Sequence, residues 1–94
     1  MTIRWSQAAS TDFAGQIACI HAERPRAAER VGRLILDQIE SLSAHPRRGR
    51  IGRLAGTREL VVAPFVIVYE IDPAGSVAVV RVLHGRQNWP EEQE

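Results

Sequence analysis

The segment from Arg47 to Arg58, RRGRIGRLAGTR, is the part of this sequence best suited to bind an anion. It holds five of the twelve arginines, three glycines and no acidic residue. Guanidinium groups bind carboxylates and phosphates through paired hydrogen bonds, so the segment predicts a contact surface for an acidic partner or a phosphate. The alternative is an ordinary solvated connection between two elements. The candidate contact residues in the segment are Arg47, Arg48, Arg50, Arg53 and Arg58.

Two of these residues, Arg50 and Arg53, sit among glycines just before the apolar runs of the second half of the chain. We expect few buried partners there, so both arginines should contribute to partner contact and little to folding. Replacing an exposed side chain usually changes the free energy of unfolding by no more than about 0.5 kcal/mol.

A second set of residues lies at the end of the predicted sheet and includes a His, a residue type suited to proton transfer near neutral pH. The set is Arg58, Glu59, Tyr69, Arg81, His84 and Arg86. Alternation along the last predicted strand places Arg81 with Val79 and Leu83 on one face and His84 on the other. These groups could therefore converge on one substrate only if a bulge interrupted a strand. The structural alternative for the charged members is a cross-strand ion pair, worth about 0.2–1 kcal/mol.

Three residues stand out near the predicted sheet and the C-terminus. Tyr69 is expected to be a core aromatic whose hydroxyl reaches the edge of the sheet. Arg86 and Trp89 join the candidate contact residues, although a Trp before a proline more often folds back onto the body. The tail from Asn88 to Glu94 carries three Glu and no basic residue, and we expect it to be partly frayed.

Several kinds of chemistry find no support in the sequence. The three histidines are scattered and Cys19 is the only cysteine, so we predict no metal site and no cofactor. The glycines of GRIGRLAG lack the Lys-Ser/Thr ending of a phosphate-binding loop. All cationic side chains are Arg, which keeps its proton in proteins, so no Lys can serve as general acid or base.

Length and composition indicate one small domain spanning residues 1–94. A chain that is 45% apolar and 24% charged has the composition of an ordinary folded protein. No window approaches the roughly 18 consecutive apolar residues of a membrane span. The N-terminal sequence MTIRWSQAAS lacks a basic-then-apolar signal, so we expect the protein to stay in the cytoplasm.

The spacing of apolar residues changes from helical in the first half to strand-like in the second. Two apolar stripes predict helices from Gln7 to about Ala22 and from Pro25 to His45-Pro46. Runs rich in Val and Ile, together with a short first strand, predict strands at Ile3–Trp5, Arg58–Val62, Phe65–Asp72 and Val77–His84. The predicted fold class is α+β, in the order β-α-α-β-β-β. A helical hairpin should pack on a small, twisted, mainly antiparallel sheet, because short connections favour antiparallel neighbours.

Four segments in this order resemble the RelE/ParE superfamily of toxins, which are the toxin halves of bacterial type II toxin–antitoxin modules. The segments are LSAHPRRGR at Leu42–Arg50, GTREL at Gly56–Leu60, IVYEI at Ile67–Ile71 and VLHGRQNWP at Val82–Pro90. The resemblance covers nearly the whole chain, and the combination is specific although each piece is short. It implies the same fold and a toxin as the product.

The resemblance implies one of two activities. RelE-like and YoeB-like members cleave messenger RNA in the ribosomal decoding site, whereas ParE-like members block DNA gyrase. The nucleases carry an Arg where this chain has Val66, and no Lys is present here. These departures favour a ParE-like gyrase inhibitor. The alternative is a ribosome-dependent endoribonuclease that uses Glu59, Arg81 and His84, since YoeB-like nucleases keep a catalytic His at the last position. A third reading is a degenerate member without toxicity.

The resemblance also implies a partner. Members of the superfamily are neutralised by a small cognate antitoxin, which usually has its own DNA-binding domain and whose tail wraps the toxin. The surplus of Arg in the 47–58 segment would suit acidic residues on such a tail. Apolar grooves beside the helical hairpin would suit its hydrophobic anchors. DNA contact would then belong to the antitoxin, and no membrane would be involved.

Overall fold

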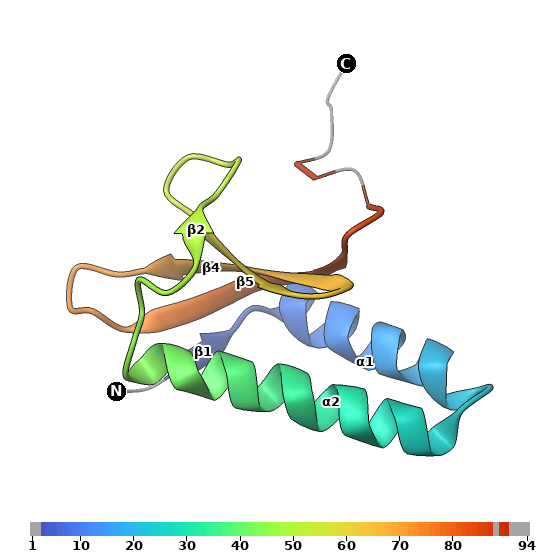
Figure 1. Ribbon diagram of the computed structural model, residues 1–94. Helices are drawn as coiled ribbons and strands as arrows, with labels where there is room; N and C mark the ends of the chain where they lie inside the picture. The colour runs from blue at the N-terminus through green and yellow to red at the C-terminus, as the bar shows by residue number, and fades with distance from the viewer. Residues whose placement is uncertain (1–2, 88, 91–94) are drawn as a thin grey trace.

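The computed structural model describes residues 3–87 and 89–90. The two helices form a hairpin on one face of a single sheet, while the loop between β2 and β3 and the C-terminal segment project on the opposite side (Figure 1). The predicted α+β fold is confirmed. The elements in chain order are β1 (Ile3–Trp5), α1 (Gln7–His21), α2 (Pro25–Glu40), the 3₁₀ helix η1 (Ser41–Ser43), β2 (Arg50–Ile51), β3 (Arg58–Val62), β4 (Phe65–Ile71) and β5 (Val77–His84).

The sheet has five strands in the order β1-β5-β4-β3-β2. Strands β3, β4 and β5 form the predicted antiparallel meander, and β2 pairs with β3 in the same sense. Strand β1 instead runs parallel to β5, where Ile3–Trp5 pairs with Val77–Val79. The first strand of the chain therefore lies beside the last, and β1 and β2 form the two edges of the sheet.

The helices begin where the sequence predicts. The Ser6 hydroxyl accepts a hydrogen bond from the Ala9 N–H at 2.9 Å and caps α1. Pro25 opens α2, at a position where a missing N–H leaves no helical bond unmade. Both apolar stripes face the sheet, and the main core joins them to strand residues such as Leu60, Ile67, Tyr69, Val79 and Val82.

Two details differ from the prediction. Helix α2 ends at Glu40 and continues as η1, before the predicted end at His45-Pro46. The Ser41 hydroxyl donates to the Gln38 carbonyl at 2.6 Å, a local bond that competes with helical pairing. The second difference is strand β2, whose two residues follow no apolar pattern.

A bulge in β5 separates the residues of the two sheet faces. The β4–β5 register shifts beside Val68, which pairs with Arg81, and leaves Val80 as the extra residue. Val79 therefore joins the core under the helices, whereas Leu83 packs on the opposite side. We call these sides the helix face and the open face. The prediction that Arg81 shares one face with both Val79 and Leu83 is wrong, because the bulge reverses the alternation between them.

Side chains from the start of the chain close the edge of β5 where β1 ends. The Ser6 hydroxyl donates to the Val80 carbonyl at 2.7 Å. Asp12 of α1 accepts a hydrogen bond from the Val82 N–H at 3.0 Å. The Arg81 guanidinium also donates to Asp12, at 2.6 and 3.0 Å. These bonds fix α1 against the last strand.

Candidate functional site

The predicted anion-binding arginines lie on residues 46–59, which lead into and form the β2–β3 hairpin; we call this segment the arginine hairpin. At its centre is Glu59, which is 1% exposed and pairs with Arg50 in the β2–β3 register. The Glu59 carboxylate accepts two hydrogen bonds from the Arg50 guanidinium, at 3.2 and 2.8 Å. Its other oxygen accepts the Arg53 N–H at 3.0 Å and lies 3.5 Å from the Arg53 guanidinium. One buried carboxylate thus holds two arginines.

These contacts keep Glu59 ionised. Burial raises the pKa of this carboxyl, but the hydrogen bonds from the Arg53 N–H and the Arg50 guanidinium, together with both positive charges, outweigh burial. They hold the pKa of Glu59 below its ordinary value of 4.5. A carboxylate whose pKa is lowered is a weaker proton acceptor, and the bonds of Glu59 to Arg50 and Arg53 hold the hairpin together.

Tyr69 and Arg58 secure the base of the arginine hairpin. The buried Tyr69 hydroxyl donates to the Pro46 carbonyl at 2.6 Å and accepts the Gly49 N–H at 2.9 Å. This confirms the predicted core aromatic with a bonded hydroxyl. The Arg58 guanidinium donates to the carbonyls of Gly49, at 2.8 Å, and Arg47, at 3.3 Å. No side chain fits at position 49, because a Cβ there would lie 2.7 Å from the Tyr69 ring.

The expectation that Arg50 and Arg53 have few buried partners is therefore wrong. Both bind Glu59, although their own side chains remain 57% exposed and still carry charge to the surface. Arg48 is also held, since its guanidinium donates to the Ser41 hydroxyl at 2.6 Å. The arginine hairpin is therefore held together by ion pairs and hydrogen bonds while it presents an exposed cationic surface.

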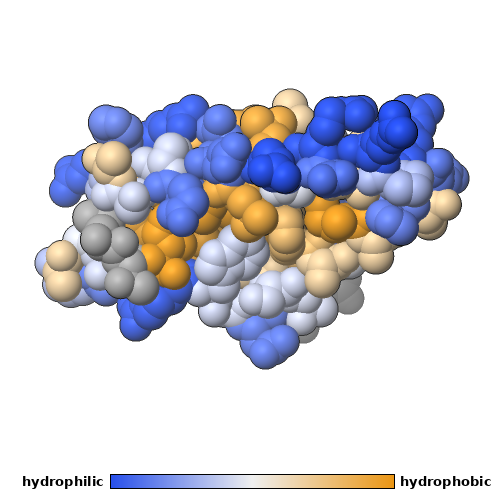
Figure 2. Space-filling model, turned by 90° about the horizontal axis from the view of Figure 1, so that it is seen from below, coloured by the Kyte–Doolittle hydropathy of each residue, from blue (hydrophilic) through white to orange (hydrophobic). Residues whose placement is uncertain are grey.

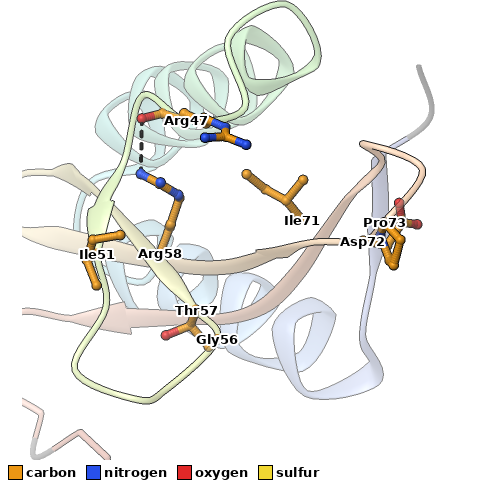
Figure 3. A pocket seen from close by; sticks show the side chains of 8 residues that line it. All are labelled: Arg47, Ile51, Gly56, Thr57, Arg58, Ile71, Asp72 and Pro73. Carbon is orange, nitrogen blue, oxygen red and sulfur yellow. Dashed lines mark hydrogen bonds between the residues drawn. The ribbon is translucent and has the colours of Figure 1, made fainter.

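Arg47 lies in a different environment, at a cleft on the helix face of the sheet. Figure 3 shows its side chain extending into the cleft toward Ile71, with the Arg58 guanidinium beside it. Within residues 3–87 and 89–90, no hydrogen bond or ion pair engages the Arg47 guanidinium. Asp72, the acidic residue of the cleft, is paired with Arg4 at 3.3 Å. The cleft measures about 540 Å³ and is lined by Arg47, Ile51, Gly56, Thr57, Arg58, Ile71, Asp72 and Pro73.

The three candidates for RNA cleavage do not come together. Glu59 and Arg81 lie in one row on the open face, on either side of Val68, with which both are paired. His84 pairs with Phe65 on the helix face and meets its ring edge-on, with 5.7 Å between ring centroids. The carboxylate and the guanidinium are therefore separated from the imidazole by the sheet itself.

The C-terminal segment folds back across the open face. The Arg81 guanidinium lies 5.5 Å from the centroid of the Trp89 ring, a cation–π contact. The exposed Arg86 donates its backbone N–H to Nδ1 of His84 at 3.2 Å. Of the tail predicted to fray, residues 88 and 91–94 lie outside the described residues. The Trp89 side chain packs against Val66, Val68 and Leu83.

Sequence reasoning missed Asp12, the residue that engages Arg81. The two side chains are 16% and 25% exposed and form a bidentate pair between α1 and β5. Asp12 is the only carboxylate on α1 and stands next to Phe13 of the apolar stripe. A lone carboxylate beside a buried stripe is a signal for a cationic partner on the element that the helix covers.

Within residues 3–87 and 89–90, no group of three or more His, Cys, Asp or Glu residues could hold a metal ion. Neither helix in that part of the chain has the length and apolar content that crossing a membrane requires.

These features define a small α+β protein with an exposed cationic hairpin. Comparison with known proteins gives its family. Residues 3–89 match the family described as "ParE toxin of type II toxin-antitoxin system, parDE", so the chain belongs to this family of toxins. It is also 37% identical over 91 residues to a Sinorhizobium fredii protein named "Putative toxin Y4kP", covering 95% of this chain and 93% of that protein. The predicted place in the RelE/ParE superfamily is confirmed.

Solved structures of three related proteins share the fold. A chain of the chromosomal ParDE system from P. aeruginosa has a TM-score of 0.78 at 20% identity, over 89% of this chain and 95% of that one. A chain of the toxin–antitoxin complex RelBE2 from Mycobacterium tuberculosis scores 0.62 at 25% identity, over 88% and 95%. A YoeB/ParE toxin from Agrobacterium tumefaciens scores 0.63 at 18% identity, over 89% and 98%. Because proteins named ParE, RelE and YoeB share this fold, the fold alone does not distinguish their activities.

Proposed function

We propose that this toxin acts in the cytoplasm by binding DNA gyrase and inhibiting it, as the ParE-like branch does. The main support is that the residues a nuclease would need are bound to other side chains or lie on opposite faces of the sheet. Glu59 is engaged by two arginines, Arg81 is engaged by Asp12, and His84 lies on the opposite face of the sheet. RNA cleavage requires a base for the 2′-hydroxyl, a cation for the phosphate and an acid for the leaving group. Inhibition by binding requires no catalytic group, only a surface complementary to the target.

The proposed contact surface is the arginine hairpin with the neighbouring C-terminal segment. The hairpin carries exposed guanidinium groups held in place by bonds to the body, so little side-chain freedom is lost when a partner binds. A concentration of positive charge also speeds association with an acidic surface. The residues proposed to take part are Arg47, Arg48, Arg50, Arg53, Arg58, Arg86 and Trp89.

The alternative function is a ribosome-dependent messenger RNA endoribonuclease. One observation favours it: Glu59 and Arg81 share the open face in a single row. His84 would then have to reach that face from the end of β5, and both charged residues would have to leave their ion pairs.

A supercoiling assay with purified gyrase tests the proposal. We expect excess toxin to inhibit supercoiling, and we expect His84→Ala to inhibit equally well because the imidazole has no part in binding. The exposed helix residue His21 supplies a matched control, His21→Ala. Absence of inhibition by excess toxin would refute gyrase as the target. Toe-printing of a translated message adds the opposite test, since new cleavages in the ribosomal A site that vanish in His84→Ala would establish the alternative.

We also propose that the toxin is neutralised by a cognate antitoxin. Two of the related structures come from a ParDE system and a RelBE2 toxin–antitoxin complex. In this chain, a groove of about 470 Å³ between α1 and α2 includes Phe13, Ile17 and Leu36, with Gly32 at its floor. Figure 2 shows apolar surface along the helical hairpin, framed by hydrophilic side chains. Such a groove fits the apolar face of an amphipathic partner segment.

The Leu36→Ser variant tests the role of the groove. Leu36 is 43% exposed, so its replacement should leave folding nearly intact while weakening binding of the antitoxin encoded beside the toxin gene. The exposed Ala18→Ser on α1 is the control. Unchanged affinity for Leu36→Ser would place the antitoxin elsewhere. Specific binding of operator DNA by the toxin alone, at physiological salt, would contradict the assignment of DNA contact to the antitoxin.

A further inference from the structure

We propose that the cleft beside the arginine hairpin binds an acidic segment of a protein partner, with a carboxylate on Arg47 and Arg58 and an aliphatic side chain on Ile51. The inference deepens the proposed function and rests on it in one respect, namely that the toxin works through protein partners. The cleft is separate from the groove between the helices, because the two share no lining residue.

The charges of the cleft support an anionic ligand. Two guanidinium groups line it, and its one carboxylate is already engaged. Asp72 is paired with Arg4 at 3.3 Å through one oxygen, and its other oxygen accepts the Ser76 N–H at 2.8 Å. Glu59 lies on the open face and is held by other arginines. The positive charge of Arg47 and Arg58 is therefore left for a ligand to neutralise.

The geometry of the two arginines prepares them to share one carboxylate. The same nitrogen of Arg58 donates to the carbonyls of Gly49 and Arg47, and these bonds fix the plane of its guanidinium. The remaining N–H groups of that guanidinium are left for a ligand. The Arg47 side chain extends into the same space from the turn that precedes β2 (Figure 3). A carboxylate seated there would accept charge-assisted hydrogen bonds from two donors with little ordering cost.

The rest of the lining favours a peptide over a nucleic acid. Ile51 is 75% exposed, the most exposed of the large hydrophobic residues in the described part of the chain. Ile71 and Pro73 continue the apolar wall across the cleft. The lining contains no aromatic side chain on which a base could stack. A carboxylate followed closely by an aliphatic side chain matches both halves of the site.

Side-chain NMR of the full chain tests the inference directly. The probe is the synthetic peptide acetyl-Leu-Glu-Leu-Glu-Leu-amide, and its matched control has Gln in place of both Glu. We expect the acidic peptide to shift the Nε–H resonances of Arg47 and Arg58 in a saturable way, and the Gln peptide to leave them unchanged. Arg47→Gln should weaken binding about tenfold, because it removes a charged donor. The matched control Arg26→Gln, on the exposed surface of α2, should not.

Two further measurements separate the possible ligands. Ile51→Ser should weaken binding of the acidic peptide. It should leave the weak response of the Arg resonances to sodium acetate unchanged, because only the peptide carries a Leu side chain beside its carboxylate. A ten-nucleotide oligothymidylate should bind more weakly than the peptide. Tighter binding of the oligonucleotide, with the same loss in Arg47→Gln, would overturn the inference in favour of nucleic acid. Peptide binding that is absent, or that Arg47→Gln leaves intact, would also overturn it. None of these results bears on gyrase inhibition, which the supercoiling assay measures separately.

Discussion

The arginine hairpin contains two pairs of arginines with opposite surroundings. Arg50 and Arg53 share the buried carboxylate of Glu59, which lies on the open face. Arg47 and Arg58 line a cleft on the helix face, whose one acidic residue is paired with Arg4. The difference shows that the number of arginines in a basic segment does not identify those that bind a partner. What matters is which of them the fold has already supplied with a counter-charge.

The largest effect on stability should come from Glu59→Gln. The Gln side-chain amide has only one oxygen, so it cannot accept hydrogen bonds from both arginines, and its NH₂ group would face one of the two cations. We expect a loss of about 2–3 kcal/mol, since hydrogen bonds to charged groups are worth about 1.5–3 kcal/mol each. For a domain of this size the melting temperature should fall by about 8–24 °C. The exposed neighbour Glu70 gives the matched control, Glu70→Gln. Equal melting temperatures for the two variants would show that the ion pairs of Glu59 with Arg50 and Arg53 do not stabilise the fold.

Acid should reduce the difference in stability between the unmodified protein and Glu59→Gln. The pKa of Glu59 is lower in the folded protein than its ordinary value of 4.5, so the unfolded chain takes up the proton first. The stabilisation is therefore complete above that value and is lost as the pH falls through the lower, folded pKa. Urea denaturation of the unmodified protein and of Glu59→Gln at pH 7 and pH 3 measures this. We expect the gap between the two midpoints to shrink at pH 3, and a gap independent of pH would contradict the ion-pair explanation.

A smaller effect should follow from Tyr69→Phe, which removes the hydroxyl at the base of the hairpin. The Pro46 carbonyl loses its donor and the Gly49 N–H loses its acceptor. We expect a loss of about 1–2 kcal/mol, measured by urea denaturation. Hydrogen exchange should also become faster at the Gly49 amide. Unchanged exchange there would mean that the hydroxyl does not hold the base of the hairpin.

The smallest effect on stability should come from Arg47→Ala, within about 0.5 kcal/mol, because no partner within the described residues is lost. Arg50→Ala should cost more, since it leaves Glu59 with one cation fewer. Thermal melting of the two variants side by side sharpens the contrast between the arginine in the cleft and the arginine bound to Glu59. A larger loss for Arg47→Ala than for Arg50→Ala would reverse the comparison.

Much of the fold follows from local patterns in the sequence. The Ser6 cap, Pro25 and the two apolar stripes fix the helices, and the Val- and Ile-rich runs fix β3, β4 and β5. Strand β2 carries no such pattern, because two residues of an arginine-rich segment become a strand only by pairing with β3. The site depends on contacts of the same kind. The predicted arginines form the hairpin, but neither the Glu59 ion pairs nor the reversal of faces at the β5 bulge can be read from neighbouring residues.

The bonds that Ser6 and Asp12 make to β5 also oppose aggregation of the protein with other copies of itself. Past Trp5, the Val80 carbonyl and the Val82 N–H would otherwise form an open strand edge, and such edges recruit strands from other molecules into aggregates. Both groups are occupied by side chains of the same chain. At the other edge of the sheet, β2 is only two residues long, contains Arg50 and lies between Arg48 and Arg53, so a second copy meets like charge. Fibril growth is thereby opposed at one edge by hydrogen bonds and at the other by electrostatic repulsion.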